Sequence, residues 1–242
     1  MIDRDRDRAV GKGMGAGKLN ALRAIRVDGL PRFRAVPAID GATPNDECNC
    51  KTLYLIRHGQ AAHNVQERPW GAELIDAQLT SEGRRQAVQL RSTSEHLPLE
   101  AVIVSPLSRA IETALLGLTT HRERGIPFVA SEDCREQFGA NLPDQRPATA
   151  ELRRQFGAVD FEGLAATDVL FTPEREPLEA LAARANRFLD YLMKRPEQHL
   201  GVVTHSSFLA ALCNVALDTS GSPGLREWFD NAELRVARVT CC

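Results

Sequence analysis

The chain has 242 residues, of which 43% are hydrophobic, and a formal net charge of -2 at pH 7. This length and apolar content support one substantial core, so we expect a single catalytic domain with an extension. The near-neutral charge gives no electrostatic case for binding nucleic acid or a membrane surface, and no run is apolar and long enough to cross a bilayer.

Residues 1–50 differ in composition from the rest of the chain. The first residues alternate Asp and Arg, and a Gly-rich stretch follows over 11–17. We therefore expect this extension to be disordered or loosely packed. Its arginines leave organellar targeting open, but the early aspartates count against a transit peptide, so a cytoplasmic location is preferred.

A buried parallel strand is predicted over 52–56, where an apolar run stops abruptly at Arg57-His58-Gly59. Residues just past the carboxyl end of such a strand face the crevice in which open α/β sheets bind ligands. A guanidinium can fork two phosphate oxygens, an imidazole can be a nucleophile, and a glycine lets the backbone approach a ligand. Taken alone, this segment fits an ordinary strand and polar turn equally well.

A second junction of this kind follows a β-branched strand over 101–104. Ser105 is a suitable N-cap and Pro106 a suitable first residue for a helix over 106–118. Arg109 then falls in the first turn, where a cation opposes the helix dipole unless an anion lies between them. Such a local conflict indicates a functional site.

The third junction follows a Val-rich strand over 200–204, which ends at His205. Either Ser206 or Ser207 would cap the apolar helix predicted over 206–215. Three strand ends therefore bring arginine and histidine side chains to one side of one sheet.

The remaining patterns complete a three-layer α/β/α sandwich with a mainly parallel central sheet over residues 51–242. The helix over 177–194 has an apolar stripe that we expect to pack on the sheet, with Arg184 on or near its solvent side. The loop-rich stretch 137–176 is expected to form a cap over the pocket, and Arg146 is one of its candidates for substrate selection. Further elements are predicted at 80–95 (helix), 126–129 (strand) and 234–239 (strand).

Taken together, the motifs resemble the histidine phosphatase superfamily, which includes cofactor-dependent phosphoglycerate mutase and many phosphatases. The resemblance implies a phosphoglycerate mutase-like fold, and the segment 135–139 further resembles a fungal and plant branch of phosphoglycerate mutase-like proteins. The matching residues, in the order of the family's motifs, are Arg57-His58-Gly59, Asn64, the segments 76–83 and 105–110, and His205.

The resemblance also assigns roles to these residues. His58 is the nucleophile that forms a phosphohistidine, and His205 is its electrostatic partner. Arg57 and Arg109 bind the phosphoryl oxygens, with His205 and Asn64 as further phosphate-binding groups.

The leaving group needs a proton, which the family takes from an acid after the second motif. Glu136 is the candidate for this role, and Asp133 is the next choice. Glu132 and Asp144 remain competitors. His63 is interpreted as a loop or rim side chain rather than a catalyst.

No metal and no cofactor are expected, because the arginines already supply the positive charge that a phosphoryl group needs. Six cysteines do not make a disulfide framework in a chain of this length. The two compact pairs, Cys48/Cys50 and Cys241/Cys242, lack the Cys/His spacing of a recognisable zinc site.

The favoured function is hydrolysis of a small phosphomonoester, with a small phosphorylated molecule as the partner and no prediction of oligomeric state. A phosphoglycerate mutase is the first alternative, although the residues 60–64, Gln-Ala-Ala-His-Asn, differ from the Glu-Ser and Trp-Asn pattern that follows the triplet in true mutases. The second alternative is a catalytically silent protein that binds a phosphorylated ligand. Every matched position is filled here, whereas silent proteins usually lose the nucleophile or an arginine.

Overall fold

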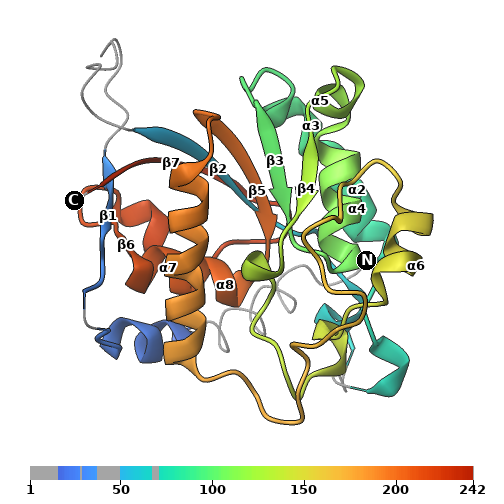
Figure 1. The fold of residues 1–242 in the computed structure, drawn as a ribbon, viewed down its shortest axis with the longest axis horizontal. Coiled ribbons are helices and arrows are strands. Elements are labelled where there is room, and N and C mark those ends of the chain that lie inside the picture. Colours follow the sequence, from blue (N-terminus) through green and yellow to red (C-terminus); the bar gives the residue numbers. More distant parts are fainter. Residues whose placement is uncertain (1–15, 28, 37–49, 67–70, 242) are drawn as a thin grey trace, which may run out of the picture.

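The computed structural model describes residues 16–27, 29–36, 50–66 and 71–241 (Figure 1). In this part of the chain a seven-stranded sheet forms the centre of the fold. Its strands are arranged in the order β4 (Phe128–Ala130), β3 (Ala101–Val104), β5 (His199–Thr204), β2 (Lys51–Arg57), β7 (Leu234–Cys241), β1 (Phe33–Val36) and β6 (Leu217–Asp218). The four pairings β3·β4, β3·β5, β2·β5 and β1·β6 are parallel, and β7 is antiparallel to both neighbours. The mostly parallel sheet confirms the predicted α/β class.

Apolar side chains alternate between two cores on opposite faces of this sheet. On β2, Leu53 and Leu55 enter one core and Tyr54 and Ile56 the other, as expected for a strand buried on both faces. Figure 1 shows α7 and α8 to one side of β5, and α2 and α4 to the other. The helices are α2 (Ser81–Gln89), α3 (Arg91–Ser94), α4 (Ser108–Gly117), α5 (Thr119–Glu123), α6 (Thr149–Gln155), α7 (Leu178–Lys194) and α8 (Ser206–Ala211).

Most predicted elements are present, with shifted ends. The strand at 101–104 has the predicted bounds, and the helix predicted at 177–194 is α7. The helix predicted at 80–95 is divided into α2 and α3 at Leu90. The helix predicted at 206–215 is α8 only as far as Ala211, and a π-helical turn follows over Leu212–Ala216.

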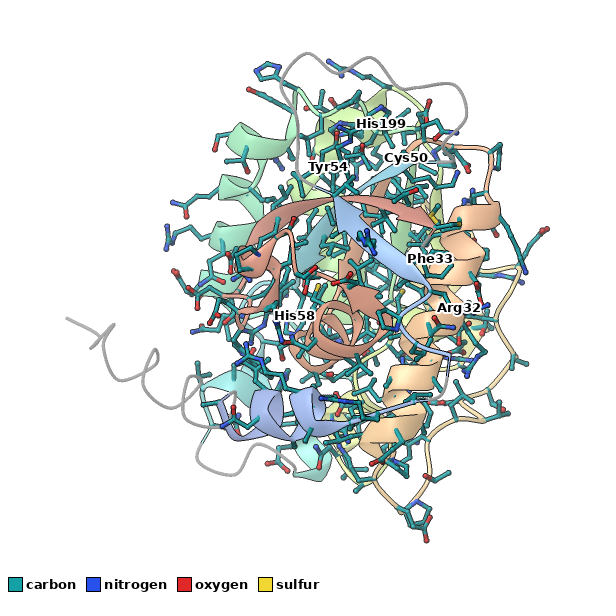
Figure 2. All side chains as sticks on the ribbon, turned by 90° about the vertical axis from the view of Figure 1, so that its left-hand side faces the viewer. Arg32, Phe33, Cys50, Tyr54, His58 and His199 are labelled. Carbon is teal, nitrogen blue, oxygen red and sulfur yellow. The ribbon has the colours of Figure 1, made fainter. Side chains whose placement is uncertain are left out.

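Two parts of the N-terminal segment are packed, the helix over 16–24 and strand β1, which corrects the expectation of a loosely packed extension for these residues. A helix over 16–24 buries Leu19 and Leu22 in the same core as α7. Strand β1 inserts between β7 and β6 and buries Phe33, which Figure 2 labels. Alternate residues of this short strand face the core, so it joins the sheet despite its arginine. Residues 1–15 and 37–49 lie outside the described part.

Two further observations concern membranes and metals. No helix within the described residues has the length and apolar character needed to cross a bilayer. In the same part of the chain, no group of three or more His, Cys, Asp or Glu side chains is arranged to hold a metal ion. Cys48 and Cys242 lie outside the described residues.

Candidate active site

Strand β2 delivers His58 to the carboxyl edge of the sheet. Its backbone N–H donates to Thr204 O on the neighbouring strand at 2.9 Å, and its ring Nδ1 lies 2.6 Å from Gly59 O. A carbonyl can only accept, so Nδ1 carries the ring proton and Nε2 keeps a free lone pair. Burial, followed by the charges of Arg109 and His205, lowers the pKa of His58 well below its ordinary value. The ring is therefore neutral, with the tautomer that a nucleophile requires.

The glycine of the triplet is required by packing. A Cβ on Gly59 would lie 2.5 Å from Gly83 O, and a Cβ on Gly83 would lie 1.9 Å from Gln60 O. The loop after β2 thus rests directly on the first turn of α2, which Thr80 caps by accepting the N–H of Gly83 at 3.0 Å. The sequence predicts that Gly59 lets a ligand approach the backbone. In the structure it is instead α2 that lies against the space where a Cβ of residue 59 would be.

Three histidines gather at this edge. His205 follows β5, its ring centroid lies 5.0 Å from that of His58, and its Nε2 lies 2.7 Å from Ser105 Oγ. The ring of His63 lies 5.9 Å from that of His58. The Nδ1 atoms of His63 and His205 are buried without a hydrogen-bond partner among the described residues. Unpaired buried nitrogens cost about 1–3 kcal/mol each, and these two belong to the rings that lie beside His58.

Both predicted arginines lie close enough to this cluster for their charges to lower the pKa of His58. Arg57 donates Nη1 to Phe229 O at 2.7 Å, and burial lowers its pKa to about 10, which leaves it charged at neutral pH. Arg109 is fully buried and donates to Pro143 O at 2.6 Å and to Asp144 Oδ1 at 2.8 Å. The Nε atoms of both arginines are buried and unpaired among the described residues. The protein therefore holds Nη1 of Arg57 and both Nη atoms of Arg109, and neither Nε is used in a hydrogen bond within the described part of the chain.

Helix α4 starts later than predicted. Ser108 is its first residue, and the carboxylate of Asp76 accepts the Ser108 N–H at 2.9 Å and its hydroxyl at 2.5 Å. Asp76 therefore caps α4 in place of the predicted residue Ser105. The hydroxyl of Ser105 instead contacts Nε2 of His205. Arg109 lies in the first turn as expected, and the acidic partners Asp76 and Asp144 offset its conflict with the helix dipole.

Glu136 lies beside the start of α8 and is 8% exposed. Its Oε1 accepts the Gln137 N–H at 2.8 Å, and its Oε2 accepts the Ser207 N–H at 3.2 Å and the Ser206 hydroxyl at 3.3 Å. Burial raises the pKa of this carboxyl, but the charge of Lys18 and the backbone donors outweigh burial and bring the pKa to about 2. In the ligand-free protein the carboxylate is therefore ionised at neutral pH.

The competing acids are engaged elsewhere. Asp133 is 37% exposed and pairs with Arg187 at 3.3 Å. Asp144 is paired with Arg109, and Glu132 with two buried arginines. Asn64 is exposed, and its Oδ1 accepts the Ala61 N–H at 2.9 Å, so its phosphate-binding role stays a prediction. Of the four candidate acids, Glu136 is the one that binds the first residues of α8, directly after His205.

Residues 53–241 match the sequence model of the histidine phosphatase superfamily (branch 1). The chain belongs to the histidine phosphatase superfamily. It is 34% identical over 226 residues to phosphoglycerate mutase-like protein 1 of Arabidopsis thaliana, which covers 77% of this chain and 80% of that protein. A probable phosphatase of Schizosaccharomyces pombe is 32% identical over 168 residues, and the match covers 64% of this chain and 74% of the yeast protein.

Solved structures of two kinds share the fold of this superfamily member. A phosphoglycerate mutase from Bacillus anthracis superposes with a TM-score of 0.55 at 21% identity, covering 78% of this chain and 88% of that one. The alpha-ribazole phosphatase of Shigella flexneri gives 0.53 at 22% identity, with 76% and 89% covered. The fold is thus phosphoglycerate mutase-like, and it hosts proteins named for either activity.

In this member of the superfamily Arg184 is 2% exposed, so its predicted place on the solvent side of α7 is wrong. Its guanidinium pairs with Glu176 at 2.6 and 2.9 Å. It also donates to the carbonyls of Asp133, Arg135 and Glu136 at 2.9, 2.8 and 3.0 Å. Arg184 therefore fixes the backbone that presents the Glu136 carboxylate.

The cap segment over 137–176 is tied to the domain by buried arginines. Arg146 is 3% exposed and donates to Glu132 and to the carbonyls of Ala165 and Thr167. Its guanidinium is fully used in binding Glu132 and the backbone of the cap, which leaves no nitrogen for a substrate and argues against a role in substrate selection. The role of this segment over the pocket remains a prediction.

Proposed function

We propose that the protein is a phosphatase that hydrolyses a small phosphomonoester through a phosphohistidine on His58. The observation that carries this proposal is a neutral His58 with Nε2 free, in one site with a buried, ionised Glu136. A nucleophile of this kind accepts the phosphoryl group, and a carboxylate of this kind accepts a proton from water.

The reaction then takes two steps. His58 Nε2 attacks phosphorus, the bond from phosphorus to the ester oxygen breaks, and the leaving oxygen takes a proton. Water next attacks the phosphohistidine and gives its proton to Glu136, and the phosphorus–nitrogen bond breaks to release inorganic phosphate. The Nε groups of Arg57 and Arg109, which have no hydrogen-bond partner among the residues that the structure describes, stabilise the charge on the non-bridging oxygens in both steps.

The proton for the leaving group enters with the substrate, because Glu136 is ionised in the free protein. A phosphomonoester loses its second proton at a pKa of about 6, so the monoanion still carries one. The negative phosphoryl group raises the pKa of the neighbouring Glu136, which can then take this proton and pass it to the leaving oxygen.

We expect kcat/KM to be highest on the acid side of neutrality. The lower limb reports His58, whose lowered pKa keeps it neutral and active well into the acid range. The upper limb follows the second pKa of the substrate, near 6. Profiles for an alkyl and an aryl phosphate check this, since their upper limbs should shift with the substrate. An upper limb at the same pH for both would place the proton on the enzyme instead.

Replacing Glu136 by glutamine should lower kcat for an alkyl phosphate by about 10²–10⁴-fold. The loss should be much smaller in the first step for p-nitrophenyl phosphate, whose leaving group needs little protonation, and single-turnover release of p-nitrophenol measures that step. Asp133→Asn is the matched control, because Asp133 is surface-exposed and should leave both rates unchanged. Equal first-step losses on the two substrates would remove Glu136 from the acid role.

A mutase is the second candidate, because a relative is named phosphoglycerate mutase-like and a mutase shares the fold. Incubation with 3-phosphoglycerate and 2,3-bisphosphoglycerate should release inorganic phosphate, since the ionised Glu136 favours attack by water. Efficient interconversion of the phosphoglycerates without net phosphate release would replace the phosphatase proposal by the mutase.

A further inference from the structure

A lysine from the N-terminal helix reaches the active site. Lys18 lies in the helix over 16–24, outside the segment 53–241 that matches the superfamily. Its Nζ donates to Gln137 Oε1 and to Ser207 Oγ, each at 2.9 Å. Figure 2 shows this helix below the edge of the sheet that carries His58.

The helix is held in place without the help of Lys18. Leu19 and Leu22 are buried in the core that contains α7 and α8. Arg23 donates Nε to Asn214 Oδ1 at 3.0 Å and Nη2 to Arg226 O at 3.2 Å. Loss of the Lys18 ammonium therefore leaves apolar packing and two side-chain hydrogen bonds to keep the helix docked.

The two partners of Lys18 are the residues that hold the Glu136 carboxylate. Gln137 and Ser207 each donate a backbone N–H to it, at 2.8 and 3.2 Å. Both acceptors of Lys18 are neutral, so neither cancels its charge, and that charge acts on Glu136. The ammonium thus supports the carboxylate in two ways, by fixing its neighbours and by favouring its ionised form.

Other charged groups also face Glu136 from the elements around it. Arg175 adds a positive charge from the cap, weaker in its effect than that of Lys18. Arg57 interacts with the carboxylate from the end of β2, and His63 from the turn that follows it. Arg184 binds the backbone carbonyl of Glu136 from α7. Among these groups Lys18 is the one that also hydrogen-bonds to Gln137 and Ser207.

We propose that Lys18 is a positioning residue of the active site, which orients the Glu136 carboxylate for proton exchange through Gln137 and Ser207. The N-terminal helix is then a functional part of this enzyme. This inference rests on the proposed role of Glu136 as the group that exchanges the proton.

The test compares Lys18→Met, Lys18→Arg and the exposed control Lys194→Met in the full chain. For an alkyl phosphate, kcat of K18M should fall about ten- to a hundredfold with little change in KM, because the carboxylate is less well oriented. The kcat profile reports the enzyme–substrate complex, in which Glu136 holds the proton; its upper limb should move up by about 1 pH unit in K18M, because a neighbouring cation no longer favours the ionised carboxylate. K18R should recover most of the activity, and K194M should match the wild type.

Three results would overturn the inference: an unmoved limb in K18M, equal losses in K18M and K194M, or a raised KM with kcat unchanged, which would make Lys18 a direct substrate contact. Thermal unfolding checks that K18M is folded, and Lys18→Gln is measured in the same way if it is not. Glu136→Gln separates this failure from that of the proposed function. If E136Q distinguishes alkyl from aryl phosphate and K18M does not shift the limb, only the role of Lys18 fails.

Discussion

Alanine at position 58 should abolish the phosphoenzyme and lower kcat/KM by a factor of about 10⁴ or more. The ring proton on Nδ1 is committed to Gly59 O, so Nε2 of His58 is the free lone pair that attack on phosphorus requires. Rapid quenching with a labelled phosphoester should trap an acid-labile, base-stable adduct in the wild type and none in H58A.

The matched control for this experiment is His121→Ala. His121 is also buried, but it lies on α5, with its Nε2 2.8 Å from Leu97 O. H121A should keep the adduct and most of the turnover once corrected for folded protein. An adduct in H58A, or near-normal turnover, would contradict the assignment. Wild-type protein that turns over no aryl phosphate yet retains a phosphorylated ligand would indicate a silent binding protein.

Arg184→Met should lower the free energy of unfolding by about 3–5 kcal/mol, because it leaves the buried Glu176 carboxylate without its partner. Three backbone carbonyls lose their donor in the same variant. For a chain of this size the change corresponds to a drop in Tm of about 10 °C. Denaturant unfolding and thermal scans followed by circular dichroism measure both quantities.

Arg187→Met provides the control one turn along the same helix. Arg187 is 60% exposed and its ion pair with Asp133 is at the surface, so its removal should cost about 0–1 kcal/mol. Similar losses in R184M and R187M would mean that the buried pair with Glu176 does not stabilise the fold. The folded fraction of R184M should also show a lower kcat, because the backbone carbonyl of Glu136 no longer has its hydrogen bond from Arg184.

The elements that could be predicted from the sequence are those with strong local patterns. The β-branched run over 101–104 gave a strand with its correct bounds, and the apolar stripe of α7 gave its length. The histidines and arginines at three strand ends do meet, because parallel strands place their carboxyl ends at one edge. The sequence predicts His63 as a loop or rim side chain, whereas the turn after β2 brings its ring to 5.9 Å from that of His58.

The features that could not be predicted depend on distant partners. Asp76 binds the terminus of α4 from 32 positions earlier in the chain, whereas sequence patterns identify a cap only next to its helix. The apolar stripe of α7 predicts that Arg184 faces solvent. It is buried instead, because Glu176 and three backbone carbonyls bind its guanidinium. Lys18 lies in a segment rich in charged residues and glycines. That composition predicts no packed helix, although Leu19 and Leu22 have the spacing of a buried helix face.

The place of β1 in the sheet has a consequence for how the protein is made. β1 pairs with β7 and β6, so Phe33 lies opposite Cys241 and Leu217. Ribosomes add about 5–20 residues per second, so β1 waits about 10–40 s for the chain between positions 33 and 241. During that time its apolar side chains have no sheet to join and are available to chaperones. Strand β2, which carries the nucleophile, can pair earlier with its parallel neighbour β5, so β1, which follows the helix that brings Lys18 to the site, joins the sheet last.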